Sequence, residues 1–230
     1  MTILGIETAT VVCGAAVVMN GKILAESTIA EPHAHTAMLM TQVEEAIRRS
    51  GISLGDVEGF AVSIGPGSFT GLRIGVSVAK GLAWASGKRL TAVPTLRAMA
   101  LTAVRHGHVA GSGLLLAALN SRRNELYREL FELVPDGLNP VSEMCVMTPE
   151  ELLAELNDRA VTIVTDSQAF REKALLHPKL QVLSPEASRC SAADVALEGE
   201  SRLLLGMDAD PSALEPMYGK EFQTTLRATS

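Results

Sequence analysis

The sequence predicts an α/β protein built from two related halves. Three short apolar runs open the chain, and Asn20-Gly21 between the second and third is typical of a two-residue hairpin turn. Strand-like and helix-like segments then alternate up to residue 104. This order, three strands followed by α-β-α-β-α, is that of a ribonuclease-H-like unit, in which helical crossovers add parallel strands.

Apolar periodicity and turn residues set the bounds of each element in the first half. Leu39, Val43 and Ile47 recur at four-residue spacing, and Gly51 suits the position after the last helical turn. The expected elements are strands at 2–6, 11–18 and 22–29, a helix at 36–50, a strand at 59–64, a helix at 70–86, a strand at 90–93 and a helix at 95–104.

The second half repeats the run–turn–run layout after the glycine-rich stretch 107–113. Residues 125–134 suit a helix by propensity, but the repeat favours a strand. Thr148 suits an N-cap and Pro149 the first helical position. The expected elements are strands at 114–119, 125–134 and 161–165 and helices at 149–157, 166–176 and 191–205.

The domain boundaries follow from this layout. We expect a first ribonuclease-H-like half at 1–108 and a second, degenerate one at 109–212. The C-terminal segment 213–230 is expected to pack back on the first half.

Composition narrows the class of protein. Hydrophobic residues make up 47% of the 230 residues but aromatic ones only 3%, so the core is aliphatic. The start of the chain contains Glu7 and lacks a basic region, which argues against a signal peptide, and no run is long enough to span a membrane. Three widely spaced cysteines favour free thiols in a reducing compartment. We therefore expect a cytoplasmic protein without a membrane partner.

Charge is unevenly distributed along the chain. The net charge is −6, yet residues 59–124 contain no Asp or Glu and eight Lys or Arg. An acidic ligand or partner near the middle of the chain would explain this distribution, as would an apolar core segment whose few charges are basic.

A glycine-rich turn between the strand at 59–64 and the next helix carries the most information. Its backbone N–H groups would attract an anion at the helix start. The common phosphate and nucleophile motifs nevertheless fail. No acidic residue follows at dinucleotide-fold spacing, no Gly-Lys-Ser/Thr occurs, and the glycines around Ser68 are wrongly spaced for a nucleophile elbow. Small residues then recur every four positions, which predicts close packing on one helix face. They are Gly71, Gly75, Ala79, Ala83 and Gly87.

Four segments carry a family resemblance. They are Ile3-Leu4-Gly5-Ile6-Glu7-Thr8-Ala9-Thr10, the run Gly65-Pro66-Gly67-Ser68-Phe69-Thr70-Gly71-Leu72-Arg73-Ile74-Gly75, Gly81-Leu82-Ala83 and Val93-Pro94-Thr95-Leu96. Together they resemble the TsaB (formerly YeaZ) family of bacterial tRNA threonylcarbamoyladenosine biosynthesis proteins. Near the C-terminus, Leu214-Glu215-Pro216-Met217-Tyr218 is similar to the family's E-P-x-Y element. The resemblance implies an actin-like ATPase fold of two ribonuclease-H-like halves.

The resemblance also implies a non-catalytic scaffold rather than an enzyme. Its partner would be a TsaD-like transferase, assisted by a TsaE-like ATPase. The chain would contact tRNA only as part of this complex. In the absence of the transferase it would form a homodimer. The first two helices of the family dock on the partner. The residues expected to bind the partner are therefore Leu39, Val43, Ile47, Leu72, Arg73, Val76 and Lys80.

Both hairpins that hold phosphate in actin-like ATPases depart from the required pattern. The first carries Glu7 where the family usually has Asp and lacks glycine, and the second offers Asn120 where an acid would stand. We expect the chain alone to bind no cofactor. Binding of ATP or ADP at the partner interface stays as an alternative. Glu7 would cap its own turn or contact that shared ligand. The weak candidates for nucleotide binding are Glu7, Thr8, Thr10, Gly67 and Ser68.

Two further functions stay as alternatives. One is a stand-alone nucleotide hydrolase or peptidase of the same superfamily, and the other is direct tRNA binding by the basic central segment. Two His-x-His pairs, His33 with His35 and His106 with His108, lack a third metal ligand and are expected to be solvated.

Overall fold

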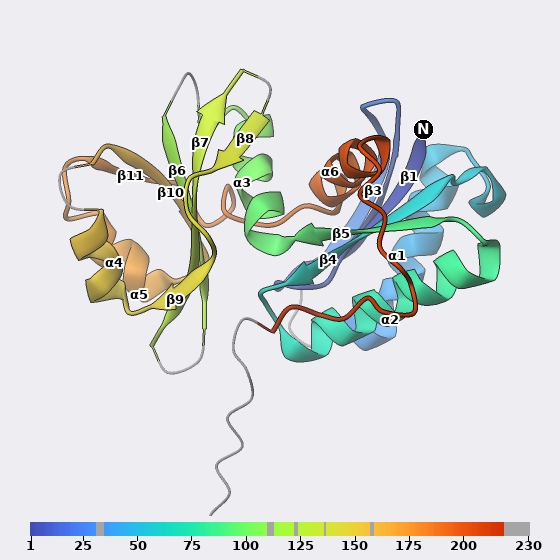
Figure 1. The fold of residues 1–230 in the computed structure, drawn as a ribbon, viewed down its shortest axis with the longest axis horizontal. Coiled ribbons are helices and arrows are strands. Elements are labelled where there is room, and N and C mark those ends of the chain that lie inside the picture. Colours follow the sequence, from blue (N-terminus) through green and yellow to red (C-terminus); the bar gives the residue numbers. More distant parts are fainter. Residues whose placement is uncertain (31–34, 110–112, 122–123, 136, 157–158, 219–230) are drawn as a thin grey trace, which may run out of the picture.

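The computed structural model of the protein describes residues 1–30, 35–109, 113–121, 124–135, 137–156 and 159–218, with side chains from residue 37 in the first helix (Figure 1). The expected actin-like fold is confirmed within these residues. Two mixed sheets share one strand order and are joined by helices that lie between them (Figure 1).

The first sheet has the order β3-β2-β1-β4-β5. Its first three strands are antiparallel, and β4 and β5 are added in parallel. The elements of this part are β1 (Thr2–Glu7), β2 (Cys13–Met19), β3 (Lys22–Ile29), α1 (His35–Ser50), η1 (Leu54–Asp56), β4 (Gly59–Gly65), α2 (Phe69–Ser86), β5 (Arg89–Pro94) and α3 (Thr95–Arg105).

The second sheet has the order β11-β10-β6-β7-β8, and β9 also pairs with β7. Here β6 and β7 correspond to β1 and β2, while β10 and β11 take the parallel positions. The elements are β6 (Leu114–Asn120), β7 (Leu126–Val134), β8 (Gly137–Pro140), β9 (Cys145–Met147), α4 (Pro149–Glu155), β10 (Val161–Thr165), α5 (Gln168–Ala174), β11 (Leu180–Val182) and α6 (Ala192–Leu204).

Alternating strand residues build a separate core on each face of a sheet, because successive side chains of a strand point to opposite faces. In β1, Leu4 and Ile6 pack toward α1 and α2, whereas Ile3 packs toward α6. In β6, Leu116 packs toward α4 and α5, and Leu115 packs toward α3. Each sheet is thus covered by helices on both faces.

The two halves exchange their last helices. The third helix of the first half, α3, packs its apolar residues into the core of the second sheet, while α6 packs on the first sheet (Figure 1). Gly5 and Gly199 allow this close approach, since a Cβ at either would overlap Ala196 or Ala61. The bounds expected for the two halves, 1–108 and 109–212, stay a prediction. They do not foretell this exchange, because a helix pattern shows an apolar face but not the sheet that covers it.

Local sequence signals account for several elements. Asn20 and Gly21 both have positive φ, as the predicted hairpin turn requires. Thr148 caps α4 in a capping box with Glu151. The short strands β8, β9 and β11 carry no pattern long enough to predict.

Two expectations from composition can be compared with the fold. No helix in the described part of the chain is long and apolar enough to cross a membrane. The three cysteines are present as thiols: Cys13 and Cys190 are buried and Cys145 is half-buried.

Candidate partner-binding face and the turn beneath it

The glycine-rich run packs directly on the first hairpin turn of its own half. The Ser68 amide donates to the Ala9 carbonyl oxygen at 2.7 Å. A Cβ at Gly67 would overlap that same carbonyl, and a Cβ at Gly71 would overlap the Thr8 carbonyl oxygen. The stripe of small residues therefore serves packing inside the chain at its N-terminal end.

Glu7 caps the hairpin turn from within. Its Oε1 accepts hydrogen bonds from the amides of Ala9 at 2.9 Å and Thr10 at 3.0 Å and from the Thr10 hydroxyl at 3.2 Å. Its Oε2 accepts from the Cys190 thiol at 3.3 Å. The side chain is fully buried, and this burial raises the pKa of the Glu7 carboxyl, against the opposing effect of its hydrogen bonds.

The five candidate nucleotide residues are brought together, but their polar groups bond within the turn and the glycine-rich run packed on it. The Ala9 and Thr10 amides already donate to Glu7, and the Gly71 amide donates to the Ser68 hydroxyl at 3.2 Å. A phosphate at this turn would have to replace these bonds. The expectation that Glu7 caps its turn is confirmed.

Four of the seven residues expected to contact a partner are core residues instead. These are Leu39, Val43, Leu72 and Val76, each at most 3% exposed. Their assignment to a partner surface is wrong, because the most apolar stripe of a helix that covers a sheet turns toward the sheet. Ile47 is half-buried against the same core, and Lys80 donates to the Leu214 carbonyl at 3.0 Å. Arg73 alone of the seven is exposed.

The outer surface of the two helices carries a different set of residues. Trp84 is 76% exposed and Met40 is 45% exposed, so two large apolar side chains lie open to solvent on these helices. Gly81 has nothing within 4 Å of where a Cβ would stand, so no contact within the described chain explains a glycine there. We call this surface the α1–α2 face and define it by the exposed residues Met40, Glu44, Arg73, Ser77, Gly81 and Trp84.

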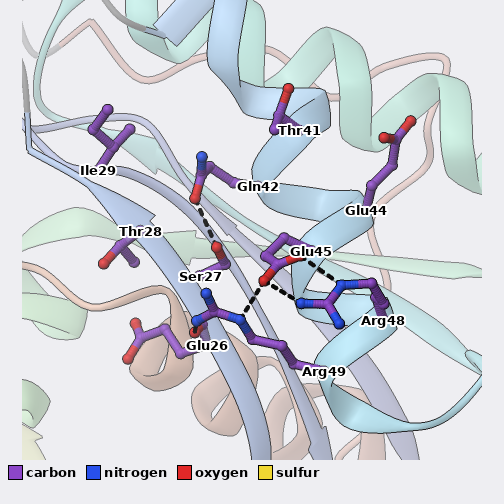
Figure 2. A pocket seen from close by; sticks show the side chains of 10 residues that line it. All are labelled: Glu26, Ser27, Thr28, Ile29, Thr41, Gln42, Glu44, Glu45, Arg48 and Arg49. Carbon is purple, nitrogen blue, oxygen red and sulfur yellow. Dashed lines mark hydrogen bonds and ion pairs between the residues drawn. The ribbon is translucent and has the colours of Figure 1, made fainter.

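A groove of ≈ 610 Å³ lies between β3 and α1, beside this face (Figure 2). Figure 2 shows Glu45 pointing between Arg48 and Arg49, and both arginines bond to it. The hydrogen bonds from Arg48 and then Arg49 lower the pKa of Glu45 to about 2. The Ser27 hydroxyl donates to Gln42 at 2.7 Å. These polar groups thus hydrogen-bond to one another within the groove.

A cleft of ≈ 680 Å³ lies between α3, α6 and the strands β7 and β8. Two close ion pairs cross it between the exchanged helices. The Arg97 Nε donates to Glu198 at 2.6 Å, and Arg105 forms two bonds to Asp194 at 2.8 and 2.9 Å. These pairs fasten α3 to α6.

The histidine pairs give no metal site that the structure can describe. His33 and the side chain of His35 lie outside the described residues. The rings of His106 and His108 lie 6.0 Å apart, and both residues are exposed. Among described residues, no group of three His, Cys, Asp or Glu side chains is placed to hold a metal ion.

The paired sheets define an actin-like ATPase fold. Its first hairpin turn, which holds phosphate in such ATPases, is capped by Glu7 of this chain and covered by Gly67 and Gly71. A family model described as TsaD, tRNA N6-adenosine threonylcarbamoyltransferase, matches residues 22–191. The tRNA threonylcarbamoyladenosine biosynthesis protein TsaB of Escherichia coli K12 is 34% identical over 195 residues, covering 81% of this chain and 83% of the relative. The chain belongs to the TsaB family.

One further relative agrees with this membership, and two solved structures share the fold. The TsaB of Haemophilus influenzae is 30% identical over 182 residues and covers 75% of each chain. YeaZ from Pseudomonas aeruginosa has the same fold, with a TM-score of 0.83 at 23% identity over 94% of this chain and 99% of that one. Component A of (R)-2-hydroxyglutaryl-CoA dehydratase from Acidaminococcus fermentans has a TM-score of 0.50 at 8% identity, over 89% and 99% of the two chains.

Proposed function

We propose that this chain is a non-catalytic scaffold subunit in the biosynthesis of threonylcarbamoyladenosine in tRNA. It binds a TsaD-like transferase through the α1–α2 face, and that subunit transfers the threonylcarbamoyl group to adenosine. The names of the E. coli and H. influenzae relatives support the pathway. The TsaD-family match over residues 22–191 supports a paralogous transferase as partner, since related helices can pair in a pseudo-symmetric way.

The observation that carries the proposal is the exposed apolar side chain of Trp84 beside the open backbone of Gly81. A glycine inside a helix costs about 1 kcal/mol relative to alanine, and at Gly71 close packing on Thr8 offsets this cost. Gly81 has no such contact within the described residues. A partner helix that approaches closely at Gly81 and covers Trp84 supplies both missing contacts. Tryptophan is also the residue type most enriched at interface hot spots.

The filled turn supports a role without independent catalysis. Glu7 uses the two backbone donors that a phosphate would need there, and it is buried. In this proposal any ATP or ADP binds where the chain meets its partner, a TsaE-like ATPase assists the complex, and tRNA contacts the complex rather than this chain alone. When the transferase is absent, the same face forms a homodimer.

The test replaces Trp84 with Glu and measures affinity for the TsaD-like transferase of the same organism by isothermal titration calorimetry. The matched control is Leu176→Glu, because Leu176 is 83% exposed in the second half and far from α2 in the chain. We expect Trp84→Glu to weaken binding at least about tenfold, as hot-spot truncations do, and the control to bind like the wild type. Both variants should keep the wild-type unfolding midpoint.

Three results would contradict the proposal. Equal binding by Trp84→Glu and wild type would remove the α1–α2 face as the interface. Absence of any complex with the transferase would remove the scaffold role. ATP turnover or peptide cleavage by the purified chain, abolished by Glu7→Ala or Ser68→Ala, would establish the enzymatic alternative instead.

A further inference from the structure

A C-terminal strap, residues 209–218, runs along α2 (Figure 1). The Ala209 amide donates to the Leu90 carbonyl at 2.7 Å, Lys80 donates to the Leu214 carbonyl, and the Met217 amide donates to the Ile64 carbonyl at 2.7 Å. The strap therefore runs antiparallel to α2 and brings Tyr218 to the first turn of that helix.

Tyr218 holds Arg73 in a fixed position at this helix end. The Arg73 Nε donates to the Tyr218 hydroxyl at 2.9 Å, and the guanidinium carbon lies 3.8 Å from the centre of the Phe69 ring. The two rings are 5.0 Å apart, and the guanidinium also lies 5.7 Å from the Tyr218 ring. The Tyr218 carbonyl accepts a bond from the Tyr127 hydroxyl of β7 at 3.2 Å. Cation–π contact and two tethers thus orient one exposed cation.

Arg73 still has donors to offer. Its Nε is occupied, but within the described residues its two Nη groups have no hydrogen-bond or ion-pair partner, and the side chain is exposed. An arginine held by a ring stack has already lost part of its side-chain entropy, so a ligand meets a pre-organised fork of donors.

A carboxylate fits this fork better than a phosphate does. The amides of Ser68 and Gly71, which would help to bind a phosphate at the start of α2, already donate to Ala9 and to the Ser68 hydroxyl. A carboxylate needs only two parallel N–H donors, which the Nη pair of an arginine supplies. The whole segment 59–124 contains no acidic residue that could compete from the same helix.

We propose that Arg73, positioned by Phe69 and Tyr218, is a pre-set receptor for a carboxylate side chain of the transferase-like subunit. This inference rests on the proposed function and deepens it, since it assigns the chemistry of one contact on the α1–α2 face. Tyr218 acts as a positioning residue, and the strap makes a C-terminal element part of the partner surface.

The experiment measures the affinity of the full chain for the transferase at low and high salt, using Arg73→Ala, Arg73→Lys and Tyr218→Phe. We expect Arg73→Ala to weaken binding about tenfold at low salt and less at high salt, because screening reduces the wild-type contribution. Arg73→Lys should lose nearly as much, since an ammonium lacks the planar fork. Tyr218→Phe should lose a few-fold while keeping every formal charge. Arg189→Ala, which removes an exposed arginine from the second half, is the matched control and should bind as wild type.

The outcomes separate this inference from the scaffold role. If Arg73→Ala binds like wild type while Trp84→Glu does not, the carboxylate receptor is wrong and the scaffold role stands. If no complex forms with the wild type, the scaffold role fails first. Inorganic phosphate titrated into the chain alone, followed by the NMR signal of the Arg73 Nε–H, distinguishes the other oxyanion. A saturable millimolar shift together with unchanged affinity of Arg73→Ala for the transferase would overturn the proposal in favour of a phosphate site.

Discussion

The two halves have the same strand order but treat their first hairpin turn differently. In the first half, the turn is capped by its own Glu7, which is buried, and the glycines of α2 pack on it. In the second half, the capping carboxylate comes from the next parallel strand end, where Asp166 accepts the Asn120 amide at 2.7 Å and remains exposed. The helix after it, α5, has 7 residues against the 18 of α2.

This difference shows how one fold can make a rigid corner or an open one. The glycine backbone of α2 packs directly on the backbone of the first turn, and the strap is bonded to α2 through Lys80. At the second turn, the described residues are held by hydrogen bonds instead: the Asn120 amide donates to Asp166, and the Ser121 amide donates to the Glu125 carbonyl at 2.8 Å. The rigid half is the one that presents the α1–α2 face.

Gly71→Ala is expected to break the rigid corner. The added methyl overlaps the Thr8 carbonyl, which as backbone cannot move aside, so we expect a loss of about 3 kcal/mol in the free energy of unfolding. Gly81→Ala is the matched control on the same helix and should gain about 0.5–1 kcal/mol, because the space there is open. Urea unfolding of both variants gives the comparison, and equal effects would contradict the packing role of Gly71.

Glu7→Gln is expected to change how the free energy of unfolding depends on pH. Burial raises the pKa of the Glu7 carboxyl above its usual 4.5, so the folded state holds this proton more tightly than the unfolded state does. The stability that the protonated Glu7 carboxyl contributes is complete below the pKa of Glu7 in the unfolded state. It is lost as pH rises through the pKa of Glu7 in the folded state. The glutamine variant cannot ionise. Its free energy of unfolding should therefore increase relative to that of the wild type as pH rises from 4 to 8.

Urea titrations of wild type and Glu7→Gln at intervals across that range measure the effect. A difference in unfolding free energy that stays constant with pH would mean that Glu7 titrates alike in both states.

Asp166→Ala should have the smallest effect of the three. It removes one exposed hydrogen bond to the Asn120 amide, which water can replace, so we expect a loss below about 1 kcal/mol. Thermal unfolding by circular dichroism checks this. A loss as large as that of Gly71→Ala would show that the second turn is as tightly built as the first.

Most of the fold could be predicted from the sequence because its signals are local. Asn20-Gly21 specified a hairpin turn, Thr148 specified a helix start, and apolar runs gave the long strands within a residue or two. Short strands such as β9 lack such a signal. The exchange of α3 and α6 could not be predicted, because a helix pattern gives the apolar face and not the sheet that will cover it.

For the candidate face, the sequence predicted the two helices but not which of their residues are exposed, and the reason is related. The periodic stripe of Val43 and Val76 was assigned to a partner, although the most apolar stripe belongs to the core. Our proposal for this face rests instead on Trp84 and Gly81, a lone tryptophan on a polar edge and a glycine outside the four-residue repeat. The hold of Tyr218 on Arg73 joins residues 145 positions apart and had no local signal.

The exchanged helices make the two halves inseparable as folding units. A chain cut near residue 110 would leave α3 attached to the first fragment and α6 to the second, so each fragment would lack the helix that covers one face of its own sheet. Each exposed sheet face could then be covered only by the other fragment. Each half therefore supplies one helix to the core of the other. This arrangement favours a single cooperative unfolding transition of both sheets rather than two separate ones.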